Sequence, residues 1–184
     1  MSMIIHTHRT RLEIPSPQEA QLMLDYQLAN RDHLAPWEPQ RAADYYQLAY
    51  WQQQLATWAE AFITGQEYHF IALTPDRGRL LGVCHFTGLQ HGAFEACYLG
   101  YSIAKEQEGQ GLMREIVQAA IGYLFEETSL QRIMANYMPS NARSGRLLRR
   151  LGFEREGYAR RYLKIAGHWQ DHLLTALLRD ESWA

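Results

Sequence analysis

One stretch of the sequence, residues 96–127, restricts the possible folds more than any other. It begins with an aromatic and apolar run, Cys97–Ile103, which predicts a β-strand. A polar run and two glycines, Gly109 and Gly111, follow, and from Leu112 apolar residues recur at steps of three and four, as in an amphipathic helix. The first amides of a helix lack carbonyl partners and lie at the positive end of its dipole. Since glycine lets an anion approach the backbone, this order predicts an anion-binding turn.

The pair of glycines alone is also compatible with a tight turn that binds nothing. The dinucleotide fingerprint requires a third glycine, and this sequence has Arg114 at that position. The nucleoside-triphosphate loop requires Gly-Lys-Ser/Thr after four spacer residues, and the stretch does not contain it. These two classes of nucleotide site are therefore excluded.

The segment Glu108–Met113 resembles the pyrophosphate loop of the GCN5-related N-acetyltransferases (GNAT), a family that binds acetyl-coenzyme A. The usual pattern of the family is Gln/Arg-x-x-Gly-x-Gly/Ala, and here Glu108 and Met113 depart from it. The Gly-x-Gly-Leu-Met form is similar to the RimJ/RimL branch of ribosomal-protein N-acetyltransferases. Because a carboxylate near a pyrophosphate is unfavourable, we expect the Glu108 side chain to point away while the backbone binds.

Motifs in the C-terminal half are similar to the same branch nearly residue for residue, and the resemblance covers roughly residues 10–178. They comprise residues 132–139, 141–145, 151–159 and 171–177. The resemblance implies an α/β (α+β) protein with the GNAT acyl-CoA N-acyltransferase fold. In that fold a mixed, mostly antiparallel central sheet is splayed in the middle and flanked by helices. It also implies acetyl-CoA as co-substrate and no metal.

Length and composition indicate a single globular domain, and the resemblance implies that it is one N-acetyltransferase domain over residues 1–184. A net charge of -2 provides no general attraction to DNA or to anionic membranes. The apolar runs are too short to span a bilayer and the N-terminal residues do not resemble a signal peptide, so we expect a cytoplasmic location. Cys84 and Cys97 are expected to be free buried thiols. His168 and His172 lie at a turn, where a metal site is not expected.

The expected elements follow from hydrophobic period and turn residues. We expect strands at residues 10–14, 68–73, 80–86, 94–103, 131–137, 161–165 and 171–178, and helices at residues 16–31, 44–64, 112–127 and 140–151. Ser16 and Glu19 predict a capping box at the first helix. Two prolines predict an extended, non-helical segment at residues 33–39, residues 153–157 are expected to be a connector, and residues 179–184 to be frayed.

The resemblance assigns the cofactor to the pyrophosphate loop, to the end of the strand before it and to the helix start near Asn141. These residues are Ser102, Ile103, Glu108, Gly109, Gln110, Gly111, Leu112, Met113, Asn141, Arg143 and Ser144. Asn141 is expected to hold the pantetheine arm, with a helix cap as the alternative. The Ser144 hydroxyl is expected to hydrogen-bond the leaving sulfur, with a solvated serine as the alternative.

Acetyl transfer requires a deprotonated amine, donors for the oxyanion and a proton or hydrogen bond for the thiolate. The residues assigned to catalysis are Ser144, Glu156 and Tyr101. Glu156 is the expected base, directly or through water, although it could instead only tie down its connector. Tyr101 and Tyr137 are better suited as acids. Trp37, Glu38 and Tyr137 are expected to line the acceptor pocket, although Trp37 and Glu38 could instead form a rigid connector.

The resemblance implies acetylation of the N-terminal alanine of a small-subunit ribosomal protein, by direct attack in a ternary complex. Two alternatives stay open: acetylation of a small-molecule amine or amino-acyl toxin, and a non-catalytic acyl-CoA-binding module. The expected partner is a ribosomal protein N-terminus. Basic residues after Asn141 leave contact with the ribosomal particle open, and both a monomer and a homodimer are compatible with the sequence.

Overall fold

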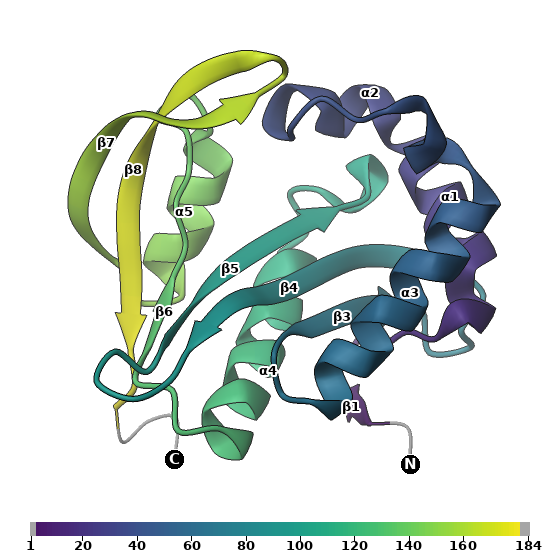
Figure 1. Ribbon diagram of the computed structural model, residues 1–184, viewed down its shortest axis with the longest axis horizontal. Helices are drawn as coiled ribbons and strands as arrows, with labels where there is room; N and C mark the ends of the chain where they lie inside the picture. The colour runs from purple at the N-terminus through teal and green to yellow at the C-terminus, as the bar shows by residue number, and fades with distance from the viewer. Residues whose placement is uncertain (1–2, 181–184) are drawn as a thin grey trace.

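The computed structural model describes residues 3–180, and within them the strands form one eight-stranded sheet of order β1-β2-β3-β4-β5-β6-β8-β7 (Figure 1). The strands are β1 (Ile4–His6), β2 (Arg11–Glu13), β3 (Tyr68–Leu73), β4 (Leu80–Gln90), β5 (Ala96–Ile103), β6 (Arg132–Met134), β7 (Glu154–Ile165) and β8 (His168–Leu178). The α-helices are α1 (Ala20–Ala29), α2 (Arg31–Leu34), α3 (Leu48–Ile63), α4 (Leu112–Glu127) and α5 (Ala142–Arg150). Short 3₁₀ helices are η1 (Pro17–Glu19), η2 (Ala35–Trp37), η3 (Ala43–Tyr46) and η4 (Lys105–Gln107).

The sheet is splayed between β5 and β6. These strands are the parallel pair in a sheet whose other neighbours run antiparallel, and they pair only along Ala96–Tyr98. From Leu99 to Ile103, β5 keeps its partner β4 on one side but has none on the other. The predicted fold, a mostly antiparallel mixed sheet with a central splay, is therefore confirmed.

Helices cover both faces of the sheet because neighbouring strand residues point to opposite sides. Phe70 and Phe86 pack with α4 and α5, whereas Ile71 and Val83 pack with α1 and α3. Cys84 is a free buried thiol in the α4 face, as is Cys97, which confirms that prediction. Burial raises the pKa of both thiols, that of Cys97 to about 12.

Several predicted local signals are confirmed. The Ser16–Glu19 capping box is complete, and both side chains bond the backbone as expected. Strand β3 and helix α4 also have the bounds that the sequence predicted. Residues 181–184 of the expected frayed tail lie outside the described residues.

The prediction that residues 33–39 are extended is wrong. Helix α2 continues into η2, and Pro36 lies in the first turn of that 3₁₀ helix, where its missing amide has no bond to lose. Glu38, which precedes Pro39, is extended, with φ −120° and ψ 159°.

Other boundaries also differ. The helix expected from Asp44 is broken by an extended Gln47, with φ −122° and ψ 145°. Residues 154–157 of the expected connector belong to β7, where a bulge at Glu156 hides the strand pattern. Strand β1 was not predicted, since a three-residue strand carries little periodic signal.

A substitution at Gly82 of β4 would test how closely β4 and β5 pack beside the splay. A Cβ at this position would lie 2.8 Å from the Ser102 carbonyl oxygen, so Gly82→Ala must displace backbone of β5. We expect a loss of about 1–3 kcal/mol in the free energy of unfolding, measured by denaturant titration. A Cβ at Gly122 in α4 meets nothing within 4 Å, and Gly122→Ala should instead stabilise by about 0.5–1 kcal/mol. Equal effects of the two substitutions would contradict this packing.

Candidate active site

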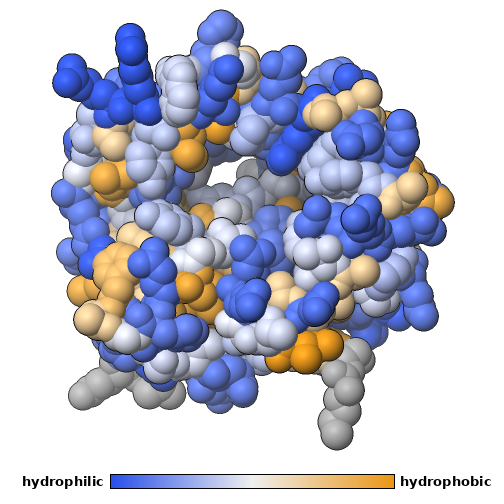
Figure 2. All heavy atoms as spheres, in the orientation of Figure 1, coloured by the Kyte–Doolittle hydropathy of each residue, from blue (hydrophilic) through white to orange (hydrophobic). Residues whose placement is uncertain are grey.

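A cleft of about 710 Å³ opens where β5 and β6 separate, and Figure 2 shows a deep hollow near the centre of this face. Most predicted site residues line it. They are Trp37, Glu38, Tyr101, Ser102, Ile103, Glu108, Gly109, Gly111, Leu112, Met113, Tyr137, Asn141, Arg143 and Ser144. Gln110 and Glu156 are not among the lining residues.

The glycine turn presents the N-terminus of α4 to the cleft. Gly109 and Gly111 have φ angles of 75° and 74°, a conformation that glycine adopts without strain. Gly111 is the N-cap residue and supplies no side-chain cap, so the first amides of α4 are left for other acceptors. The site therefore has the backbone donors and the positive helix end that a diphosphate requires.

Gln110 points out of this turn. Its side-chain Nε2 donates to the Glu106 carbonyl at 2.8 Å, and its own carbonyl accepts from Nη1 of Arg9 at 3.0 Å. The side chain thus stabilises the loop from outside. Gln110 could therefore contribute to the cleft only through its backbone.

Glu108 does not point away from the cleft, contrary to expectation. Its carboxylate forms an ion pair with Arg143 of α5, and its Oε1 lies 3.4 Å from Nε2 of His33 in α2. The Arg143 guanidinium offsets the negative charge, and the His33 ring nitrogen lies close to the same carboxylate. The sequence did not indicate His33 as a site residue, since only the fold brings α2 to this loop.

Two hydroxyl pairs flank β5 on opposite faces. Tyr101 Oη lies 2.7 Å from Ser144 Oγ on the α5 side, and Tyr26 Oη lies 2.8 Å from Ser102 Oγ on the α1 side. Burial raises the pKa of Tyr101 and of Tyr26, so both phenols stay protonated over the working range of pH. The sequence did not indicate Tyr26 as a site residue, because its partner is far away in the sequence.

Asn141 caps α5. Its Oδ1 accepts a hydrogen bond from the Ser144 amide at 3.1 Å, so the helix cap, which the sequence left open as an alternative, is present. The same bond fixes the backbone of Ser144, whose hydroxyl meets Tyr101.

Glu156 lies at the bulge of β7 and forms an ion pair with Arg132 of β6. Its side chain is half-exposed and outside the cleft lining. This position agrees with the alternative interpretation, in which Glu156 holds its own segment in place.

One end of the cleft is closed by a contact between distant segments. The Ala166 amide, at the β7–β8 turn, donates to the Glu38 carbonyl at 2.9 Å, and Figure 1 shows this hairpin reaching α2. Glu38 also pairs with Arg41 at 3.0 Å. Within residues 3–180, no three His, Cys, Asp or Glu side chains gather closely enough to bind a metal ion.

The chain was compared with known proteins. Residues 9–154 match the family model described as an acetyltransferase (GNAT) domain. The chain is 45% identical over 171 residues to the [ribosomal protein uS5]-alanine N-acetyltransferase of Escherichia coli, covering 93% of this chain and 88% of the relative. The structure of ribosomal-protein-S5-alanine acetyltransferase from Vibrio fischeri superimposes with a TM-score of 0.93 at 32% identity, over 99% of each chain.

A second solved structure, Mycobacterium smegmatis RimJ in complex with CoA-disulfide, has a TM-score of 0.88 at 26% identity over 97% of this chain and 88% of that one. The fold and the cleft define an acyl-CoA-dependent acyltransferase. The chain belongs to the GNAT acetyltransferase family, as its motifs predicted.

Glu108 competes with a diphosphate for Arg143, so its charge should weaken coenzyme A binding. We expect Glu108→Gln to lower the Kd for coenzyme A roughly three- to tenfold at low salt, with a smaller gain at high salt. Isothermal titration calorimetry measures both. Glu106→Gln, which removes an acid paired with Arg79 close to the same loop, is the matched control and should leave Kd unchanged. Weaker binding by Glu108→Gln would mean that Glu108 serves mainly to position Arg143.

Proposed function

We propose that this protein transfers the acetyl group of acetyl-CoA to the N-terminal alanine of a small-subunit ribosomal protein. The observation that carries the proposal is the 45% identity, over 93% of the chain, to an enzyme named for this reaction on uS5. The cleft supports it because one end has diphosphate donors and the other is closed by the segment around Glu38.

The residues of the cleft fit coenzyme A. The free amides at Gly109–Leu112 and the Arg143 guanidinium would hold the diphosphate. Arg146 and Arg150 also line the cleft, so the basic face of α5 is better placed for coenzyme A phosphates than for RNA. The unpaired edge of Leu99–Ile103 offers backbone groups to the pantetheine arm, which supplies the thioester when bound.

Within this arrangement, the chain orients the two substrates and stabilises charge. Tyr101 and Ser144 together supply a hydroxyl donor for the departing sulfur, and Tyr101 stays protonated because it is buried. The amine attacks directly, so no acyl-enzyme is required and catalysis depends mostly on positioning.

The proton of the attacking amine leaves to water. In the described part of the chain the acids that line the cleft are Glu38 and Glu108, and both are held in ion pairs. An N-terminal amine has an ordinary pKa near 8, so part of it is already neutral at cellular pH. A dedicated base is therefore unnecessary.

The proposal includes a cytoplasmic single domain acting on a ribosomal protein N-terminus. Between residues 3 and 180, the helices are too short or too polar to cross a membrane. A direct test is mass spectrometry of a purified uS5 N-terminal peptide after incubation with acetyl-CoA and the enzyme. One added acetyl group on the alanine is expected, and an unmodified peptide would remove the assigned acceptor.

Removal of the hydroxyl pair should affect the chemical step. We expect Tyr101→Phe and Ser144→Ala each to lower kcat about 10²-fold while the Kd for coenzyme A stays unchanged, because the donor acts on charge that develops at the sulfur. The double variant should cost little more than either single one, since the two hydroxyls act as one unit. A change in Kd without a change in kcat would assign the pair to binding.

The pH profile follows from the same assignment. Rate should rise with pH as the α-amino group loses its proton and level off above about pH 8. Because burial raises the pKa of Tyr101 above its usual value near 10, no fall is expected between about pH 8 and 10. A bell-shaped profile of kcat/KM with a descending limb below about pH 9 would contradict Tyr101 as the retained proton donor.

A further inference from the structure

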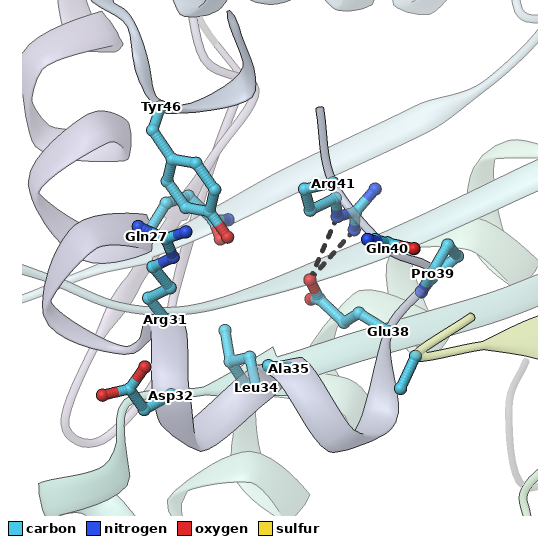
Figure 3. Close-up of a pocket in the computed structure, with 11 residues that line it drawn as sticks. Gln27, Arg31, Asp32, Leu34, Ala35, Glu38, Pro39, Gln40, Arg41 and Tyr46 are labelled. Carbon is cyan, nitrogen blue, oxygen red and sulfur yellow. Dashed lines mark hydrogen bonds and ion pairs between the residues drawn. The ribbon is translucent and has the colours of Figure 1, made fainter. Parts of the chain in front are cut away.

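A second cavity of about 350 Å³ adjoins the cleft and shares its lining residues Leu34, Glu38 and Pro39. Figure 3 shows α2 and the segment after it along one side, with Tyr46 and Arg41 facing them. Ala166 of the β7–β8 turn also lines this cavity. A peptide whose first amine lies in the cleft would therefore pass this cavity close to the acceptor side.

The cavity contains one unmatched positive charge. Arg41 donates to Glu38 through Nε at 3.2 Å and through Nη2 at 3.0 Å, so these two charges offset each other. Arg31 lies with its guanidinium 4.5 Å from the centre of the Tyr46 ring, and no carboxylate of the described residues pairs with it. Asp32 is adjacent in sequence, but Figure 3 shows its carboxyl directed away from the space between Glu38 and Tyr46.

A buried amide supplies the second polar feature. Gln27 lines the cavity and is only 6% exposed, yet its Nε2 contacts only the sulfur of Met23, at 3.8 Å. Among the described residues, its Oε1 accepts no hydrogen bond. Since Gln27 lines the cavity, this oxygen is available to an N–H donor of a ligand. A guanidinium beside a free amide oxygen matches a peptide that carries a carboxylate.

We propose that this cavity binds an acidic side chain of the acceptor peptide, downstream of the reacting amine, with Arg31 as the residue that selects it. The inference rests on the proposed acetylation of a protein N-terminus. A nucleic-acid backbone fits less well, because it carries a charge at every residue and would meet Glu38 and Asp32 as well. A single carboxylate can pair with Arg31 alone.

The test uses synthetic peptides that begin with alanine and differ only in one Glu or Gln, moved through the positions that follow. At one position, or at two adjacent ones, we expect the Glu peptide to have a KM roughly three- to tenfold below that of its Gln partner, with similar kcat. Arg31→Gln should abolish this difference. Arg31→Glu should reverse it, so that Lys at the same position becomes the preferred residue.

Arg149→Gln is the matched control, because Arg149 is exposed on α5 and lines neither cavity. It should keep the wild-type preference. Equal KM values for all Glu and Gln partners, or a preference that survives in Arg31→Gln, would overturn the inference while leaving the proposed reaction intact. Failure of the wild-type enzyme to acetylate any of the alanine peptides would overturn the proposed function, and the inference with it.

Discussion

The early separation of β5 from β6 is the constraint on which the rest of the structure depends. The two strands share only three paired positions, and beyond them β5 is bonded on one side alone. Unpaired strand groups are normally avoided inside a protein, so a gap of this kind is maintained by the packing on either side. Helix α4 packs against β4 and β5 on one face of the sheet, while pairing with β8 keeps β6 separated from the end of β5.

The gap also explains why side chains from opposite faces meet the same strand. Tyr101 and Ser102 are consecutive, so one hydroxyl reaches α5 and the other reaches α1. The proposed thioester chemistry uses the first of these two sides.

The sequence predicted those parts of the molecule that depend on neighbouring residues. The capping box at Ser16 and the glycine turn before α4 are local signals, and they were confirmed. The cleft lining was also largely predicted, because the motifs carry the family geometry with them. Pro36 misled the prediction, since a proline in the first turn of a helix costs nothing.

Contacts across the fold could not be predicted in this way. The Glu108–Arg143 pair joins two elements whose distance is set by the splay. The proposed role of Arg31 depends on a cavity that α2 and η3 enclose, which the sequence does not show. Glu156 shows the reverse case. Its motif matches the family, but a bulge and the Arg132 cation hold its side chain outside the cleft.

The central claim is that the N-terminus of α4 and the splayed half of β5 hold the acyl donor. Its most direct test is a crystal structure of this protein with coenzyme A. The account predicts diphosphate density at the amides of Gly109–Leu112 and the sulfur within hydrogen-bonding distance of the Ser144 hydroxyl. Density for the diphosphate at any other surface, with the β5–β6 gap empty, would contradict it.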